Sequence, residues 1–434
     1  MAGEWKDLTL DDLGRVVTGK TPLTSVEGNF GGRIPFVTPS DMDGRKTIST
    51  TARFLTQAGA ASVKGSVIPA GAIMVSCIGS DMGKVVVAGC ECVTNQQINS
   101  IVVDDRFSSE FVYYSLSTRK DEIRHQAAGG SAVPILNKGD FSRMEIALPP
   151  FAEQKAIAAV LGALDDKIEL NRRMNATLEA MARALFQSWF VDFDPVRAKL
   201  DGRPPAALDP ATAALFPDSF QDSTFGHIPK GWESGSILRQ ADLLSGGTPK
   251  TDVAAYWNGD VPWASAKDVS QCGEAFLVCT ERTITKQGVD ESSTKIIPAN
   301  ATVVVARGAT TGRLTMFGHA MAINQTCYGL RSKVGVPFAL YCNARHFIER
   351  LVQGGHGSIF DTITTSTFEA TDVLLAPKEV LLAFDKQVTP LFQQVHANLH
   401  QSRTLATLRD TLLPKLLSGE LSVAGVERTV EPST

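Results

Sequence analysis

The chain has 434 residues, 43% of them hydrophobic and 20% charged, a globular composition long enough for two or three domains. Its 42 Lys and Arg residues and 46 Asp and Glu residues leave a net charge of −4. This balance excludes a non-specific polycation, but it leaves open a DNA-binding protein with a local basic patch. The N-terminus lacks the basic start and apolar core of a signal peptide, and the longest apolar run, 67–78, is broken by Pro69 and Gly71. We therefore expect a cytoplasmic protein that does not enter a membrane.

The spacing of cysteine and histidine gives no sign of a metal site. The seven cysteines include no CxxC pair, and the seven histidines are scattered along the chain. Because zinc sites in proteins use ligands at short, regular spacings, this pattern predicts reduced thiols and no bound metal.

The chain repeats itself once, at an offset of 227 to 229 residues. The matching segments are Gly19-x-Thr21-Pro22 with Gly246-x-Thr248-Pro249, Asp41 with Asp268, Asn95-Gln96 with Asn324-Gln325, and Phe141 with Phe368. Two small changes of offset inside an otherwise collinear match are typical of loops in a duplicated fold. The sequence therefore predicts two copies of one domain.

Each copy has two parts of different character. The first part is rich in Gly, Pro, Thr and Val, with short apolar runs between turn residues, which predicts a mixed α/β domain with many loops. The second part has few Gly or Pro residues and predicts a long helix. The expected boundaries are 1–150 and 228–377 for the domains, 151–190 and 378–421 for the helices, 191–227 for a partly structured connector, and 422–434 for a tail.

The two predicted helices carry an apolar stripe whose spacings alternate between four and three residues, as in the seam of a coiled coil. In the first helix the stripe includes Ile157, Leu161, Leu164, Ile168, Asn171, Leu178 and Leu185. In the second it includes Val388, Leu391, Val395, Asn398, Leu405 and Leu412. Both stripes become polar at the same register, with Asn175 beside Asn171 and Ser402 beside Asn398, which favours a shared seam over two helices that each pack on their own domain. Pro390 is expected to kink the second helix or to delay its start.

The fold class expected from these features is α+β, with two duplicated mixed α/β domains separated by two long helices that form an antiparallel coiled coil. A helix of about 35–40 residues is about 50–60 Å long. Such a pair is suited to hold two DNA-reading domains at a fixed spacing. It is equally suited to a scaffold with two protein-binding heads, and the pattern alone leaves both functions open.

Several segments resemble the specificity subunits of type I restriction–modification enzymes. The central region of that family is similar to Leu148-Pro-Pro-Phe-Ala-Glu-Gln154, Leu164-Asp-Asp-Lys-Ile168 and Phe186-x-x-Trp-Phe-Val-Asp-Phe193. Ile228-Pro-Lys-Gly-Trp232 resembles the entry to a target recognition domain, and Leu412-Leu-Pro-Lys-Leu-Leu-Ser-Gly-Glu-Leu421 resembles the C-terminal helix. The second copy departs from the pattern at Pro377-Lys-Glu-Val380, so the contact made by the start of its helix is less well defined.

The resemblance implies a subunit that is not itself a catalyst. It implies binding to double-stranded DNA at a bipartite, asymmetric target, to two methyltransferase subunits and, for restriction, to motor-nuclease subunits. No cofactor is then expected on this chain, because S-adenosylmethionine, ATP and Mg belong to the partner subunits.

Three segments imitate catalytic motifs. Gly14 to Thr21 satisfies the P-loop pattern, which keeps a nucleotide-dependent enzyme using Lys20 as an alternative, but the second copy lacks the lysine. Leu148-Pro-Pro-Phe151 resembles an adenine methyltransferase motif without its polar first residue. His356, Ser358 and Asp361 have the residue types of a triad but lie on one Gly-rich loop. None of the three is expected to be catalytic.

Loop residues of the types that contact DNA occur in both copies. Arg and Lys bind guanine, whereas Ser, Thr, Lys and backbone amides bind phosphates. The candidates in the first copy are Lys20, Thr21, Thr38, Ser40, Arg45, Lys46 and Lys84. Those in the second copy are Lys250, Thr251, Ser265, Lys267, Arg307, Thr310, Thr311 and Arg313. Because the Asn-Gln pairs and Asp41 with Asp268 occur in both copies, we expect them to satisfy backbone groups and cap turns rather than read bases.

Overall fold

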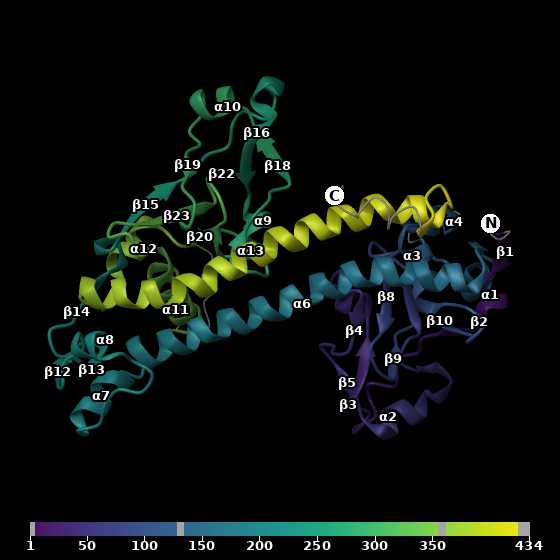
Figure 1. Cartoon of the computed structure of the whole chain (residues 1–434), viewed down its shortest axis with the longest axis horizontal. Helices are drawn as coiled ribbons and strands as arrows, with labels where there is room; N and C mark the ends of the chain where they lie inside the picture. Colours follow the sequence, from purple (N-terminus) through teal and green to yellow (C-terminus); the bar gives the residue numbers. More distant parts are fainter. Residues whose placement is uncertain (1–4, 128–133, 355–361, 424–434) are drawn as a thin grey trace, which may run out of the picture. The chain divides into compact units, whose positions relative to one another are not determined.

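The computed structural model describes residues 5–127, 134–354 and 362–423 (Figure 1). It consists of two compact units, one formed by 1–168 with 404–434 and the other by 169–403. Across the described ranges, no helix is both long and apolar enough to cross a membrane.

Unit 1 is built on a five-stranded sheet in the order β2-β10-β7-β8-β4. Its strands are β2 (Gly14–Thr18), β10 (Ile98–Val103), β7 (Ile73–Ser76), β8 (Val85–Ala88) and β4 (Thr47–Ile48). The neighbours are antiparallel except β4 and β8, which are parallel. A strand pair joins the two ends of the domain, with β1 (Lys6–Thr9) antiparallel to β11 (Glu145–Leu148).

A smaller sheet of unit 1 has the order β5-β3-β9-β6. Its strands are β5 (Phe54–Leu55), β3 (Phe30–Val37), β9 (Cys92–Thr94) and β6 (Val67–Ile68), with α2 (Gln57–Ser62) beside them. Strand β3 is bulged, because Phe30 and Ile34 both face Leu55, and the bulge includes Gly31 with a φ of 90°.

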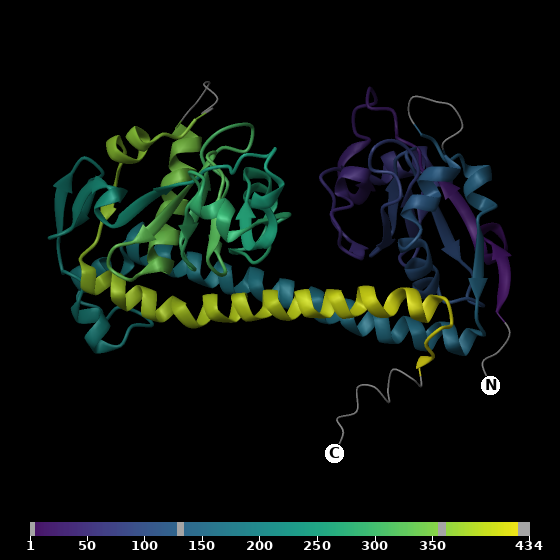
Figure 2. The same ribbon diagram turned by 90° about the horizontal axis from the view of Figure 1, so that it is seen from above.

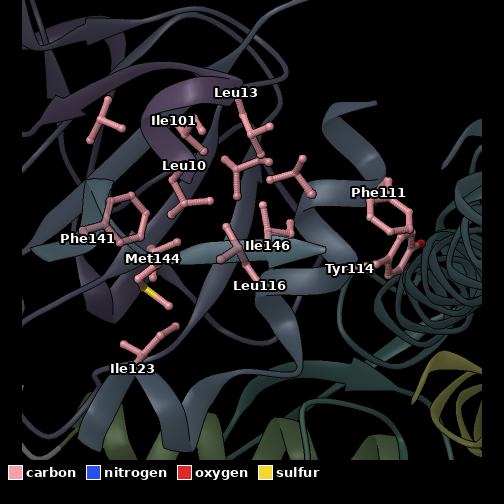
Figure 3. Packing of buried hydrophobic residues seen from close by; sticks show 14 of the residues in the cluster. Leu10, Leu13, Ile101, Phe111, Tyr114, Leu116, Ile123, Phe141, Met144 and Ile146 are labelled. Atoms are coloured by element: carbon pink, nitrogen blue, oxygen red, sulfur yellow. The ribbon is translucent and has the colours of Figure 1, made fainter. Parts of the chain in front are cut away.

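The largest of the apolar clusters described in unit 1 is drawn in Figure 3. It lies between the main sheet and four short helices, α1 (Leu10–Leu13), α3 (Ser109–Ser117), α4 (Lys120–Gln126) and α5 (Lys138–Ser142). Leu10, Leu13 and Phe141 are completely buried in it, as Figure 3 shows. The same core takes in Ile157 and Leu161, so the first long helix is anchored to the domain that precedes it.

Unit 2 repeats this plan. Its main sheet has the order β15-β23-β20-β21-β17 and its small sheet the order β18-β16-β22-β19. The main-sheet strands are β15 (Ala241–Ser245), β23 (Cys327–Ser332), β20 (Thr302–Val305), β21 (Leu314–Phe317) and β17 (Phe276–Leu277). The small-sheet strands are β18 (Arg282–Ile284), β16 (Trp257–Ala264), β22 (Met321–Ile323) and β19 (Ile296–Ile297). The helices are α9 (Ala266–Gln271), α10 (Lys286–Asp290), α11 (Pro337–Gly354) and α12 (Thr365–Ala370), and β14 (Glu233–Ser236) pairs with β24 (Asp372–Leu375).

The connector between the copies is partly regular. It contains α7 (Asp194–Leu200), α8 (Pro210–Ala214) and a hairpin of β12 (Phe220–Ser223) and β13 (Gly226–Pro229). Phe216 from this segment lies in the same apolar cluster as Trp189 and Trp232, so the connector packs on unit 2.

Two 40-residue helices, α6 (Phe151–Phe190) and α13 (Lys378–Leu417), contribute to both units. Within each unit their segments lie side by side and antiparallel (Figure 2). In unit 1, Leu416 of α13 joins the core that holds Ile157 and Leu161 of α6. In unit 2, Ala182 and Trp189 of α6 share a cluster with residues of α13. The expected pairing of two long helices in an antiparallel coiled coil is thus confirmed.

Polar contacts in the middle of the seam follow the sequence repeat. Asn171 Nδ2 donates to Ser402 Oγ at 3.1 Å, and Asn398 Nδ2 donates to Asn175 Oδ1 at 2.9 Å. The repeat offset that carries Asn171 onto Asn398 also carries Asn175 onto Ser402, so the two hydrogen bonds are counterparts. Asn171, Asn175 and Asn398 are almost completely buried, a situation that disfavours other registers of the two helices.

The expected delay at Pro390 is wrong. Helix α13 begins at Lys378 and continues through Pro390 to Leu417. Proline removes the hydrogen bond to the carbonyl of Lys386, but both residues are on the exposed side of the helix, where water can solvate that carbonyl.

Candidate nucleic-acid interface

The Gly-x-Thr-Pro turn and the Asn-Gln turn of each domain form one structural unit. Thr21 Oγ1 donates to Gln96 Oε1 at 2.7 Å, and Thr248 Oγ1 donates to Gln325 Oε1 in the second domain. The glycines allow the close approach, because a Cβ at Gly19 would lie 2.1 Å from the carbonyl oxygen of Asn95. In the second domain, a Cβ at Gly246 would lie 2.4 Å from the carbonyl oxygen of Asn324.

The asparagines stabilise their own turns. Asn95 Oδ1 accepts from the backbone N–H of Gln97 at 3.1 Å, and Asn324 Oδ1 accepts from the backbone N–H of Thr326 at 3.2 Å. The expected backbone-satisfying role of these pairs is confirmed.

Asp41 and Asp268 cap short helical turns, as the repeat predicted. Each is the third residue of a capping box, with Thr38 and Ser265 as the respective N-cap residues. The other carboxylate oxygen of Asp41 accepts from the N–H of Ala52, and that of Asp268 accepts from the N–H of Glu281. Two DNA candidates, Thr38 and Ser265, are thus already engaged as caps. A third, Ser40, lies with its Oγ 2.8 Å from Thr38 Oγ1.

Several basic candidates have acidic partners inside their own domain. Lys84 Nζ pairs with Asp81 at 3.0 Å, Arg45 pairs with Asp43 at 2.8 Å, and Lys267 Nζ pairs with Glu281 at 2.6 Å. The hydrogen bond that Lys267 donates to the Glu281 carboxylate raises the pKa of Lys267, so this ammonium stays charged. These pairs are exposed or half-exposed, so the cations remain accessible to a polyanion.

Lys46 is placed differently. Its side chain is 16% exposed and reaches Glu110 at 3.0 Å and the Tyr114 hydroxyl at 3.3 Å. The ammonium also lies over the Tyr114 ring, 5.0 Å from its centroid. The structure therefore places Lys46 between elements of unit 1 rather than on its surface.

The remaining candidates lie on exposed loops. These are Lys20, Lys250, Thr251, Arg307, Thr310 and Arg313, with Thr311 half-exposed and donating from Oγ1 to the carbonyl of Gly308. Neither Arg307 nor Arg313 makes an ion pair with any residue that the structure describes. Arg313 lines an open cleft of about 470 Å³ together with three glutamates and Arg345, whereas Arg307 does not line this cleft.

The loop that carries these arginines has a counterpart in unit 1. Gly308 and Gly312 have φ values of 94° and 87°, and Gly79 and Gly83 in the loop after β7 both have 87°. Each loop begins beside an Asn-Gln turn, because Ala306 N–H donates to the carbonyl of Thr326 and Cys77 N–H donates to that of Gln97. We call the three segments together the turn cluster: 19–22, 77–84 and 95–97 in unit 1, and 246–249, 306–313 and 324–326 in unit 2.

Where the structure describes the segments that resemble catalytic motifs, it does not support a catalytic role for them. The chain that follows Lys20 forms no helix before β3 at Phe30, so the backbone N–H cradle of a P-loop is missing. Leu148 is the buried last residue of β11, and the carbonyl of Pro149 accepts from Gln154 Nε2 at 2.9 Å. His356, Ser358 and Asp361 lie outside the described residues. Within the described ranges, no three His, Cys, Asp or Glu side chains cluster as metal ligands would.

One repeated arginine is not among the DNA-binding residues predicted from the sequence. Arg53 lies over the Phe30 ring at 4.1 Å from its centroid, and Arg282 lies over Trp257 at 3.5 Å. The signal was present in the sequence, because Thr51-x-Arg53 and Thr280-x-Arg282 match at the same offset as the Asn-Gln pairs.

Comparison with known proteins identifies the family. Residues 2–180 and 229–405 match the family model described as type I restriction modification DNA specificity domain, which covers both copies of the repeat. The chain belongs to this family. Its members are the non-catalytic DNA-recognition components of type I restriction–modification systems, so this chain is a specificity subunit and not itself an enzyme.

Individual relatives align with this chain over most of their length. The chain is 27% identical to the type I restriction enzyme MjaIX specificity subunit of Methanocaldococcus jannaschii over 97% of this chain and 94% of that protein. It is 28% identical to the HindI specificity subunit of Haemophilus influenzae over 66% of this chain and 71% of that protein. The fold is similar to the crystal structure of the S subunit from M. genitalium, with a TM-score of 0.57, 15% identity and coverage of 95% and 96%.

Proposed function

We propose that each domain of this specificity subunit reads one half of a bipartite, gapped DNA target. The observation that carries this proposal is the turn cluster, which has the same backbone plan in both domains but different residues at corresponding positions. Where unit 1 has Lys20 and Ile78, unit 2 has Gly247 and Arg307. One scaffold with two sets of loop side chains is suited to two unlike half-sites, and hence to an asymmetric target.

The helix pair sets the spacing between the half-sites in this proposal. A 40-residue helix is about 60 Å long, whereas one turn of B-DNA is about 34–36 Å. The buried polar contacts at Asn171 and Asn398 support this role, because a spacer must keep a single register.

The chain docks two methyltransferase subunits, which supply S-adenosylmethionine-dependent methylation of adenine N6, and it supports restriction with the motor-nuclease subunits. Apolar side chains on the outer faces of the long helices support the docking. Leu170 and Met181 of α6 are 50% and 49% exposed, and Leu382 and Leu408 of α13 are each 43% exposed. Large apolar side chains at this exposure are suited to partner helices. The cofactors, including ATP and Mg, are bound by the partners in this assignment.

Selection from a pool of random DNA duplexes tests this function. The chain is purified with its methyltransferase subunit, and bound duplexes are sequenced, with the methyltransferase alone as control. The proposal predicts enrichment of two short sequences at a constant separation, and only when this chain is present. A stable complex that enriches no sequence would support instead a two-headed protein scaffold without DNA readout.

A further inference from the structure

Each small sheet carries one arginine that is stacked on an aromatic ring and exposed to solvent. Arg53 of unit 1 lies over Phe30, and it also lies 5.5 Å from the ring centroid of Phe36. Arg282 of unit 2 lies over Trp257 and 5.8 Å from the centroid of Trp263. All three members correspond through the repeat: Arg53 to Arg282, Phe30 to Trp257 and Phe36 to Trp263. The two units thus contain the same stacked-arginine site.

The guanidinium groups are held in place without being neutralised. Both arginines are exposed, and neither pairs with a carboxylate among the residues that the structure describes. A stacked guanidinium loses little further freedom when its N–H edge binds an anion, because the ring already fixes its plane. This arrangement differs from Arg106, which lies 5.5 Å from the Phe107 centroid but also binds Asp104 at 3.0 Å.

A repeated bulge builds the site. Trp257 and Val261 of β16 both face Ile284, just as two residues of β3 face one residue of β5 in unit 1. Asn258, the residue after Trp257, has a φ of 61° and corresponds to Gly31. A Cβ at Gly259 would lie 2.7 Å from the carbonyl oxygen of Ile284, so the bulge needs a glycine there. The backbone therefore fixes the ring on which the arginine lies.

The site is connected to the turn cluster in unit 2. Trp263 Nε1 donates to the carbonyl of Gly247 at 3.1 Å, and Trp257 Nε1 donates to that of Lys250 at 3.1 Å. The exposed Lys250 therefore follows the turn cluster directly and lies beside the ring that Arg282 covers. In Figure 1 the small sheet of each unit lies at the end of its domain away from the long helices.

We propose that Arg53 and Arg282 each bind a backbone phosphate of the DNA duplex, one in each half-site. The inference rests on the proposed DNA-reading function. A contact that is identical in two domains with different loop side chains carries no sequence information, and phosphate contacts are of this kind. The stacked arginines thereby position each domain on the duplex, while the turn-cluster side chains read the bases.

The test uses the complex of the full chain with its methyltransferase subunit and two probes, a duplex with the selected target and one of scrambled sequence. Dissociation constants are measured over a range of salt concentrations for Arg53→Ala and Arg282→Ala. Each variant is expected to bind both probes about 5- to 20-fold more weakly, and its salt slope is expected to fall by about 1. Arg282→Lys keeps the charge and is expected to retain the salt slope.

Two controls separate charge from folding. Arg106→Ala removes an exposed, ring-associated arginine that is already neutralised, and it is expected to leave binding unchanged. Arg282→Gln keeps a planar group over Trp257 without charge, so it is expected to keep the melting temperature and still lose the salt-dependent affinity.

Unchanged affinity and salt slope in both alanine variants would overturn the inference. So would a loss confined to the target duplex with relaxed sequence preference, since that result indicates a base contact. A wild-type complex that does not distinguish the two probes contradicts the proposed function instead, and the arginine effect on salt slope is still measured in that case.

Discussion

At the scale of single residues, the repeat separates side chains that maintain the domain from those that can differ between domains. Thr21 and Thr248 make the same hydrogen bond to the Asn-Gln turn, and Asp41 and Asp268 cap the same helical turn. At position 307 the second domain has an arginine where the first has Ile78. A residue whose polar groups are satisfied by the same internal contact in both copies maintains the domain, and the differing exposed residues are the ones expected to set the sequence that is read.

Arg307 and Arg313 give the first prediction. If either contacts a base, its replacement by alanine is expected to cost roughly 1–3 kcal/mol of binding free energy and to relax recognition at the unit 2 half-site only. Competition binding with duplexes altered in one half-site measures this effect. Arg331→Ala is the matched control, because Arg331 is exposed but paired with Asp242 at 2.7 Å. If recognition is unaltered in one of the arginine variants, that arginine is not one of the residues that read bases.

Glu179 gives a second prediction, on pH dependence. It lies on α6, its side chain is 13% exposed, and it accepts from the backbone N–H of Ala275 at 3.1 Å. Burial raises the pKa of this carboxyl, so in the window between its unfolded and folded pKa the folded state binds more protons than the unfolded state. Stability therefore falls as the pH rises through that window.

The variant Glu179→Gln can keep the hydrogen bond while removing the buried charge. We expect its melting temperature to exceed that of the wild type by about 1–3 °C at pH 7, and the difference to vanish below the ordinary glutamate pKa of about 4.3. Thermal unfolding at several pH values measures this, with the exposed Glu420→Gln as control. A lower melting temperature at pH 7 would show that the charge contributes more through its hydrogen bond than it costs by burial.

At the scale of elements, corresponding packing positions of the two units are filled by different side chains. In unit 1, Asp165 of α6 accepts from the Tyr114 hydroxyl at 2.6 Å and pairs with Arg409 of α13 at 2.6 Å. The repeat carries this trio onto Tyr341, Phe392 and Ala182 of unit 2. There the tyrosine and phenylalanine rings pack edge to face at 5.8 Å, and Ala182 is buried.

This correspondence supplies a third prediction. Arg409→Ala leaves the Asp165 carboxylate, which is 8% exposed, without its cation. We expect a loss of about 1–3 kcal/mol in the free energy of unfolding, less than the 3–5 kcal/mol typical of fully buried pairs because Arg409 is itself 29% exposed.

The double variant Asp165→Phe with Arg409→Ala places the apolar residues of unit 2 at these positions. It is expected to recover most of the lost free energy of unfolding. Denaturant unfolding of the wild type and both variants measures it, with Arg173→Ala as a control for an exposed pair on α6. A double variant no more stable than Arg409→Ala would contradict the equivalence of the two positions.

The elements differ in how far the sequence predicts them. The long helices and their pairing follow from a local, periodic pattern, and Phe151 begins α6 directly after two prolines. The predicted delay at Pro390 fails because the free-energy cost of an interior proline depends on whether water can solvate the carbonyl that loses its hydrogen bond. That depends on the tertiary structure and not on the local sequence. Capping boxes and Asn turns involve residues close in sequence, so their repetition was informative.

Long-range ion pairs were beyond this kind of inference. Lys46 met every criterion for a DNA-binding lysine, yet it contacts Glu110 and Tyr114, more than sixty residues away. The stacking of Arg53 and Arg282 cannot be predicted from the sequence for the same reason, because the ring beneath each arginine comes from a neighbouring strand. The sequence shows that the arginines and their rings correspond through the repeat, but it does not show that they stack.

At the scale of the whole molecule, duplication followed by divergence accounts for the organisation of the chain. The family match covers both copies, and the polar contacts of the seam are counterparts under the repeat. A duplicated domain joined by a pair of helices is suited to an asymmetric target, because the loop side chains of each domain can change without altering the helices between them. We therefore expect the domains to determine the half-sites and the helices to determine the gap.

A methylation map obtained by long-read sequencing tests these separate roles of the domains and the helices. The chain and a variant with one heptad inserted into each long helix are each co-expressed with the methyltransferase subunit, and methylated adenines are located in the genome. Seven residues add about 10 Å of helix, and each base pair of duplex occupies about 3.4 Å. The same two half-sites are expected in both maps, with a gap about three base pairs longer in the variant. An unchanged gap would contradict the helix pair as the spacer.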